Sequence, residues 1–169
     1  MTSKPPPTPA SVLGRHRILS PTAGVKVSPL CLGAMNFGEA WKSVLGECNK
    51  ETAFSMLDYF YSQGGNFIDT AVNYQNNESE EWLGEWMEQR GVRDEMVIAT
   101  KFTGLQVAKQ VDEGKVKMAS NFGGNSAKNI HTSVERSLRQ LRTSYIDLVS
   151  LNSASFSVLF NQTQSQLSN

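Results

Sequence analysis

Apolar residues recur at helical spacing in three stretches of this chain, which predicts three amphipathic helices. Asn49 and Ser126 suit the N-caps of the first and third helices, and Gly64 and Gly91 end the first and second. The apolar positions are Ala53, Met56, Leu57, Phe60 and Tyr61, then Trp82, Leu83, Trp86 and Met87, then Ile130, Val134, Leu138 and Leu141. The second helix begins in a glutamate-rich stretch that we expect on a solvated face, namely Glu78, Glu80, Glu81 and Glu85.

Short apolar runs with little charge alternate with these helices and are typical of buried strands. They are Pro29–Gly33, Phe67–Asp69, Met96–Thr100 and Tyr145–Leu151. A small hairpin is expected before them, within residues 13–27. Because strands alternate with helices, the sequence predicts an α/β fold with a parallel sheet and helices outside. The frame is either a doubly wound sheet or a (β/α) barrel, and periodicity alone does not choose between them.

Three segments fall outside this pattern. Residues 1–12 are rich in Pro, Ser and Thr and are expected to be a disordered tail, so that a single domain spans residues 13–151. Thr103–Asn125 shows no clear period, and loops of this length are usually functional or mobile. Residues 152–169 are dominated by Ser, Asn and Gln and carry no charge, so we interpret them as a polar tail.

The charge balance and the rare residue types narrow the function classes. Lys and Arg total 16, as do Asp and Glu, so the positive excess usual for nucleic-acid or membrane-surface binding is missing. No apolar run approaches the roughly 20 residues of a membrane span, and Met1–Pro7 lacks the apolar core of a signal peptide. Cys31 and Cys48 are interpreted as free thiols, which favours a cytoplasmic location. With two scattered histidines besides, no metal site is expected.

Three polar residues lie where two of the predicted strands end. Asp69 ends one strand, Lys101 ends the next, and Tyr74 follows in the loop after Asp69. Function gathers at the carboxyl ends of parallel strands, and neighbouring strands lie about 4.8 Å apart, so the lysine can reach the aspartate. A cation beside a phenol favours its ionised form, which makes the phenol a better proton donor. The alternative is an ordinary Asp–Lys pair under a loop, with the tyrosine as packing.

A set of motifs spread over the chain resembles the aldo-keto reductases, in particular the fungal aryl-alcohol dehydrogenase and norsolorinic acid reductase-like branch. The order and spacing of the motifs carry the resemblance, which runs from about residue 13 to residue 151. The motifs are Leu30–Gly38, Gly64–Ala71 with Tyr74, Ser79–Gly84, Ala99–Lys101, Ser137–Leu141 and Tyr145–Leu148.

The resemblance implies a (β/α)8 barrel preceded by a hairpin, and an NADPH-dependent reductase acting on a carbonyl or alcohol substrate of small size. The catalytic residues of the family fall on Asp69, Tyr74 and Lys101, with Tyr74 as proton donor assisted by the other two. The segment Gly33, Ala34 and Met35, together with Asp69, is expected to face NADPH or NADP. Trp41 is either one wall of an aromatic substrate pocket or a loop anchor.

The chain departs from the family pattern in two places. The family branch has a histidine after the fourth barrel strand, where this chain has Asn152, and we interpret residues 152–169 as a tail unrelated to the family. A complete barrel has eight strands and typically about 250 residues, whereas four strands are predicted here. The fold expected is therefore the N-terminal half of the barrel. Its open sheet edges predict self-association. The alternative function is that of a catalytically inactive truncated fragment or mispredicted gene product, with at most an interaction role.

Overall fold

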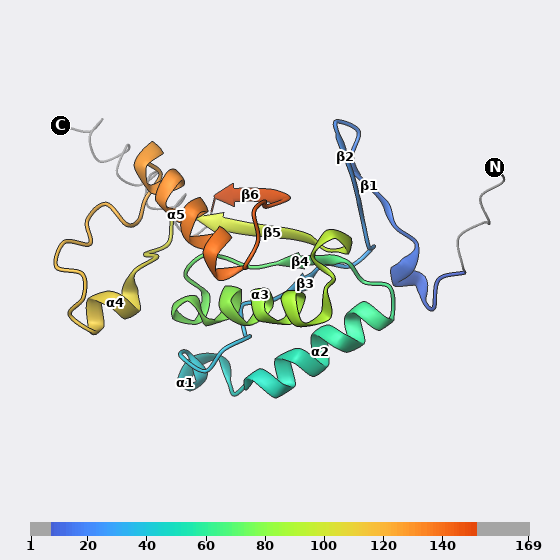
Figure 1. The fold of residues 1–169 in the computed structure, drawn as a ribbon, viewed down its shortest axis with the longest axis horizontal. Helices are drawn as coiled ribbons and strands as arrows, with labels where there is room; N and C mark the ends of the chain where they lie inside the picture. The colour runs from blue at the N-terminus through green and yellow to red at the C-terminus, as the bar shows by residue number, and fades with distance from the viewer. Residues whose placement is uncertain (1–7, 152–169) are drawn as a thin grey trace, which may run out of the picture.

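The computed structural model describes residues 8–151 of the 169-residue chain. Its main sheet is parallel and has the order β3-β4-β5-β6, with β3 at Leu32–Gly33, β4 at Phe67–Asp69, β5 at Val97–Phe102 and β6 at Leu148–Leu151. A separate antiparallel hairpin, formed by β1 (Arg17–Ser20) and β2 (Ala23–Val27), stands at the end of the sheet where the parallel strands begin (Figure 1). The hairpin and all four parallel strands are therefore confirmed.

Three long helices connect the parallel strands: α2 (Lys50–Ser62), α3 (Glu78–Arg90) and α5 (Ala127–Gln140). The caps of α2 and α5 are those predicted, because the side-chain oxygens of Asn49 and Ser126 accept from backbone N–H groups of their helices. Gly91 ends α3 in the left-handed conformation, with a φ of 66°. The shorter elements are α1 (Lys42–Leu45), α4 (Ala108–Asp112) and 3-10 turns at Val12–Gly14, Tyr74–Asn77 and Arg93–Glu95.

The strand order decides between the two frames that periodicity left open. Each parallel strand pairs with the next one along the chain. Right-handed connections between strands that always advance in one direction place every connecting helix on the same face, whereas a doubly wound sheet reverses its order to cover both. In Figure 1, α2 and α3 lie together beneath the sheet, and α5 packs against α3 and β5. The described residues therefore form part of a (β/α)8 barrel, as expected.

The hydrophobic core lies between the sheet and the two helices α2 and α3. Ile68 of β4 and Ile98 of β5 are fully buried against Leu57 of α2 and Leu83 and Trp86 of α3, all within one cluster. Burying a large aliphatic or aromatic side chain contributes roughly 1.5–3 kcal/mol, so this cluster is the main source of stability for the described residues. The cluster packs against one face of the sheet, and the candidate site lies at the carboxyl ends of the strands.

The apolar positions predicted for α5 are buried only in part, since Leu141 at its end lies in the core while the others do not. Its buried positions include Ser133 and Ser137, whereas Ile130 is exposed and Leu138 is half-buried. α3 and α5 pack closely at one point, where a Cβ added at Gly84 of α3 would lie 2.3 Å from the backbone oxygen of Gln140. Leu141 lies within this contact, so the apolar stripe reaches the core at the end of the helix, although Ile130 and Leu138 do not join it there.

A half-buried ion pair, which periodicity did not reveal, joins the residues before β6 to those before β5. Arg93 donates to Asp147 at 2.9 Å, and the same carboxylate accepts from the backbone N–H of Ile98 at 2.9 Å. The Arg93 guanidinium also lies over the ring of Tyr145, 3.9 Å from its centroid. These contacts join the turn before β5 to the residues before β6 and set the register of the last described strand.

Three smaller expectations meet the structure. The tail predicted for residues 1–12 ends before Ser11, because the Ser11 hydroxyl donates to the carbonyl oxygen of Gln63 at 2.8 Å and Val12 begins a 3-10 turn. The long segment from Thr103 to Asn125 contains α4, a helix too short to show a period. Cys31 and Cys48 are both free thiols, as expected. The predicted tail at residues 152–169 lies outside the described residues.

Candidate active site

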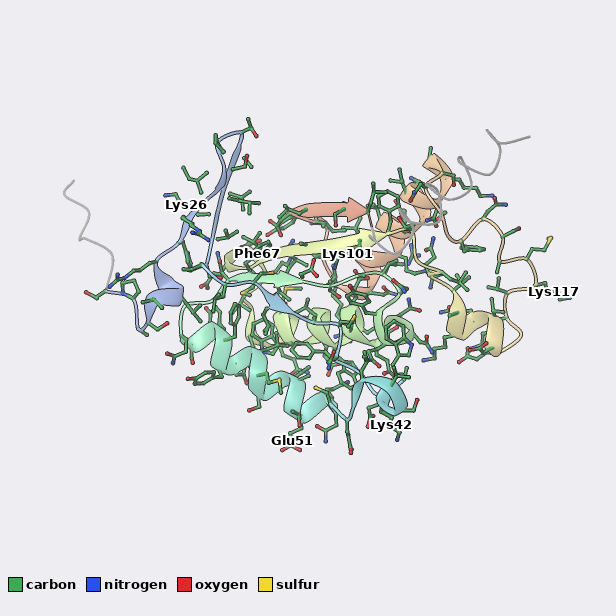
Figure 2. The ribbon with its side chains drawn as sticks, turned by 180° about the vertical axis from the view of Figure 1, so that it is seen from behind. Lys26, Lys42, Glu51, Phe67, Lys101 and Lys117 are labelled. Atoms are coloured by element: carbon green, nitrogen blue, oxygen red, sulfur yellow. The ribbon has the colours of Figure 1, made fainter. Side chains whose placement is uncertain are left out.

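The ends of β4 and β5 bring the three candidate catalytic side chains together. Asp69 is the last residue of β4 and pairs with Ala99, so Lys101 lies two residues further along β5. The Lys101 Nζ donates to Asp69 Oδ2 at 2.5 Å and to the hydroxyl of Tyr74 at 3.2 Å. Figure 2 shows Lys101 towards the opposite end of the sheet from Phe67, the first residue of β4. The proximity expected from the strand ends is confirmed.

The ammonium group of Lys101 has an acceptor for each of its three N–H donors. The third acceptor is the carbonyl oxygen of Thr70, at 2.9 Å. An ammonium has three donors and no acceptor, so the Tyr74 oxygen accepts from it and keeps its own hydrogen for a second partner. The Lys101 Nζ also lies 4.9 Å from the centroid of the Tyr74 ring, over which a cation is attracted. The phenol is thereby held as a donor at the carboxyl end of the sheet.

The segment after β4 continues alongside β5 and so brings Tyr74 close to Lys101. The backbone N–H of Thr70 donates to the backbone carbonyl oxygen of Ala99 at 2.9 Å, and the backbone N–H of Val72 donates to the backbone carbonyl oxygen of Lys101 at 3.1 Å. Thr70 and Val72 are fully buried, which anchors the segment beneath the site. Tyr74 then opens a 3-10 turn whose next three residues all have positive φ.

The residues expected to face a nicotinamide cofactor lie directly beside Asp69. Gly33 pairs with Asp69 across β3 and β4 and has open space where a side chain would be. Met35 is exposed. Ala34 is fully buried, and its backbone N–H donates to the backbone carbonyl oxygen of Asp69. Its own carbonyl oxygen accepts from the backbone N–H of Phe37 and from the hydroxyl of Ser79. A ligand at this edge can thus reach Gly33 and Met35, while Ala34 supports the loop.

Trp41 lies beside the candidate proton donor. Its ring meets that of Tyr74 edge to face, with centroids 6.3 Å apart and planes at 70°. Its indole N–H donates to the side-chain oxygen of Asn76 at 3.3 Å. The anchoring contact and the place beside Tyr74 are therefore both present, and a contact between Trp41 and a substrate stays a prediction.

The glutamate-rich start of α3 is not one solvated face, which corrects the expectation for Glu80. This side chain is fully buried, and one of its carboxylate oxygens accepts from the hydroxyl of Thr100 at 2.5 Å. Burial is the largest cause that raises the pKa of Glu80, from 4.5 to about 7. The helical spacing carried the signal, because Glu80 shares one helix face with Leu83 and Met87, three and seven residues further on.

The other polar positions discussed from the sequence lie away from this cluster. His16 pairs with the carbonyl oxygen of Gly64 at 2.8 Å, and His131 lies on α5 beside Gln106 and Phe122. Position 152, where the family branch has its histidine, falls outside the described residues. Between residues 8 and 151, no three His, Cys, Asp or Glu side chains are grouped as a metal site would require. No helix in that range is both long and apolar enough to cross a membrane.

Known proteins share both the sequence and the fold of this chain. The model of the aldo/keto reductase family matches residues 29–167. Norsolorinic acid reductase B of Dothistroma septosporum is 61% identical over 135 residues, which are 79% of this chain and 33% of that protein. An aryl-alcohol dehydrogenase of Pestalotiopsis microspora is 51% identical over 149 residues, 88% of this chain and 38% of that protein. The solved holo form of an aldo-keto reductase from Bacillus halodurans matches with a TM-score of 0.60 and 27% identity, covering 80% of this chain and 39% of that one.

Proposed function

Because the chain belongs to the aldo/keto reductase family, we propose that it is an NADPH-dependent oxidoreductase that reduces an aldehyde or ketone to the alcohol. The names of its relatives, a norsolorinic acid reductase and an aryl-alcohol dehydrogenase, favour an aromatic substrate. The observation that carries the proposal is the Lys101 ammonium, whose three donors engage Asp69, Thr70 and the oxygen of Tyr74. This arrangement leaves the phenolic hydrogen for a carbonyl oxygen.

Each member of the trio has one part in the proposed reaction. Tyr74 donates its proton to the carbonyl oxygen as negative charge develops there. The Lys101 ammonium stabilises the phenolate that remains, and Asp69 keeps that ammonium in place through their ion pair. When bound, NADPH supplies the hydride that adds to the carbonyl carbon, so the product is the alcohol.

The residues beside Asp69 fit the reactive end of such a cofactor. Gly33 has nothing within 4 Å of the place where a Cβ would stand, and Met35 is exposed on the loop that follows. Glycine allows a ligand to approach the backbone closely. We therefore assign Gly33, Met35 and Asp69 to the cofactor side of the site, with Ala34 as the buried support of that loop.

The test is reduction of substituted benzaldehydes by the purified chain, followed by the loss of NADPH absorbance. The proposed function predicts aldehyde-dependent oxidation of NADPH and formation of the benzyl alcohol in equal amounts. Titration of NADPH against the intrinsic fluorescence of the chain measures cofactor binding separately. Absence of both cofactor binding and turnover would refute the proposed function.

A second candidate is that this chain is a catalytically inactive member of the family. The observation that favours it is that the chain spans only 33% and 38% of the two relatives named above, so much of what they contain has no counterpart in the match. The same titration separates the two candidates, because an inactive chain without a complete cofactor site shows no saturable NADPH binding.

We further propose that the chain associates with itself through its sheet edges, while its reaction partner is a small carbonyl or alcohol compound. β3 and β6 are the outer strands of the described sheet, and Val149 and Leu151 of β6 are 44% and 46% exposed. Unpaired edges with apolar side chains favour strand pairing between molecules. Nucleic acid and membrane are not proposed as partners. A cytoplasmic location is proposed from the two free thiols, Cys31 and Cys48.

Charge placed on the β6 edge is expected to reduce this association. Light scattering coupled to size-exclusion chromatography should give an oligomer for the unmodified chain and a smaller species for Val149→Lys, because a lysine on an edge strand opposes pairing. Val44→Lys is the control, since Val44 is exposed on α1, away from the sheet edge. A monomer at high concentration for the unmodified chain would contradict the proposal.

A further inference from the structure

Gln75, the residue after the candidate proton donor, has a fully buried side chain in a loop made mostly of polar residues. Its side-chain amide both accepts and donates a hydrogen bond. The Oε1 atom accepts from the backbone N–H of Trp41 at 2.7 Å, and the Nε2 group donates to the carbonyl oxygen of Met35 at 3.0 Å. One side chain therefore holds both ends of the segment Met35–Trp41, which runs from the cofactor side of the site to the aromatic ring beside Tyr74.

The backbone around Gln75 is shaped for this contact. Gln75, Asn76 and Asn77 have φ values of 51°, 54° and 88°, a left-handed run that residues with side chains rarely adopt. Such strained backbone persists only where surrounding contacts hold it, and it gathers at functional sites. Asn77 supplies one such contact, because its amide donates to the carbonyl oxygens of Val72 and Gln106.

The segment Met35–Trp41 meets the turn at further points. The carboxylate of Glu78 accepts from the backbone N–H groups of Glu39 and Ala40, at 2.7 and 3.1 Å. Gly38 faces Gln75 so closely that an added Cβ would lie 2.3 Å from the Gln75 Cβ. In Figure 1, α1, which follows this segment, lies near the start of α3, where Glu78 stands. The segment is thus seated on the turn by hydrogen bonds and by close packing.

We infer that Gln75 is a positioning residue that locks Trp41 at its place beside Tyr74, so that an aryl group of the substrate is held for proton transfer. The inference rests on the proposed function and extends it, because it names what sets the aromatic wall of the site. Gln75 touches neither the Lys101 ammonium nor the Asp69 carboxylate in the hydrogen-bond pattern of the trio. Its loss therefore changes substrate placement and leaves the proton donor in its hydrogen bonds.

Gln75→Met removes both hydrogen bonds at nearly constant side-chain volume, and Gln89→Met makes the same chemical change on the exposed face of α3. We expect the KM for substituted benzaldehydes to rise about tenfold in Gln75→Met, as the loss of a hydrogen bond to a buried group implies, with kcat changed less than about threefold. The KM for small aliphatic aldehydes should stay as in the unmodified chain. Gln89→Met should leave all three constants unchanged.

Amide hydrogen exchange gives a readout that needs no turnover. In Gln75→Met, the Trp41 amide should exchange at least about tenfold faster, because its buried acceptor is gone. The Thr52 amide, which donates to the Asn49 cap of α2 at 2.9 Å, should keep its rate and so reports on the rest of the fold. If Gln75→Met does not fold, Glu78→Ala serves instead, with faster exchange expected at Glu39 and Ala40 and the same selective rise in KM.

Four outcomes are decisive. Faster Trp41 exchange with the selective rise in KM supports the inference. An unchanged Trp41 exchange rate in a folded variant, or faster exchange with an unchanged KM, overturns it. A chain that folds but neither binds NADPH nor turns over aldehyde refutes the proposed function, and with it the role of Gln75 in holding substrate. The exchange rates then show by themselves whether Gln75 still fastens Trp41.

Discussion

Tyr74→Phe is expected to lower the rate of carbonyl reduction by about 10²–10⁴-fold, the usual contribution of a positioned general acid. The substitution removes one oxygen atom, which in the unmodified chain accepts from Lys101 at 3.2 Å. The other two acceptors of the ammonium, Asp69 and the carbonyl oxygen of Thr70, remain. The fold and the ion pair should therefore persist, and the loss should appear in kcat.

The measurement is steady-state oxidation of NADPH with a substituted benzaldehyde, beside circular dichroism to show that the variant is folded. Tyr59→Phe is the matched control, because it removes the same atom from an exposed tyrosine on α2. Retention of more than about one tenth of the rate in Tyr74→Phe would be incompatible with a general-acid role of the usual size. The Asp–Lys pair would then be structural, as the alternative interpretation of the sequence has it.

Glu80→Gln is expected to remove a pH dependence of stability that the buried carboxyl introduces. Its pKa in the folded chain is raised from 4.5 to about 7, chiefly by burial. Between these values the folded state binds the proton and the unfolded state releases it, so the free energy of unfolding falls as pH rises. The contribution is fully present below pH 4.5 and is lost by about pH 7. At about 1.4 kcal/mol per pKa unit, roughly 2–3 kcal/mol is lost between pH 5 and pH 8.

Urea unfolding at pH 5 and pH 8 gives the measurement. The amide of Glu80→Gln keeps an acceptor for the hydroxyl of Thr100 and carries no titrating proton, so its unfolding free energy should fall by roughly 2–3 kcal/mol less than that of the unmodified chain over this range. Glu81→Gln makes the same change one residue along, at an exposed position, and should follow the unmodified chain. Equal pH dependence in all three chains would show that Glu80 ionises freely in the folded state.

Most of the helices and strands could be predicted from the sequence, for a clear physical reason. Helical and strand periods reflect which side chains leave water, and the caps and glycines at helix ends are local chemistry that tertiary contacts seldom overrule. The same logic located Asp69 and Lys101, because the carboxyl ends of adjacent parallel strands meet at one edge of the sheet. Glu80 could have been found in the same way, since it shares a helix face with Leu83 and Met87.

Periodicity did not show which polar positions of α5 are buried or how closely this helix approaches α3. Ser133 and Ser137 are buried, and the end of α5 at Gln140 lies against the backbone of α3 at Gly84. No single-helix pattern contains that information, since the separation of two helices belongs to both of them. Of the apolar positions predicted for this helix, Leu141 lies in the core, whereas Ile130 is exposed.

By itself the sequence determined that this chain alternates strands and helices and that Asp69, Tyr74 and Lys101 meet at one end of the sheet. Only the tertiary structure showed that the strands advance in order and that the helices lie on one face, which agrees with the barrel that the family resemblance implied. It alone also showed that Gln75 is buried and joins Met35 to Trp41. A glutamine in a polar loop looks like any other until its hydrogen-bond partners are known, because those partners lie 34 to 40 residues away along the chain.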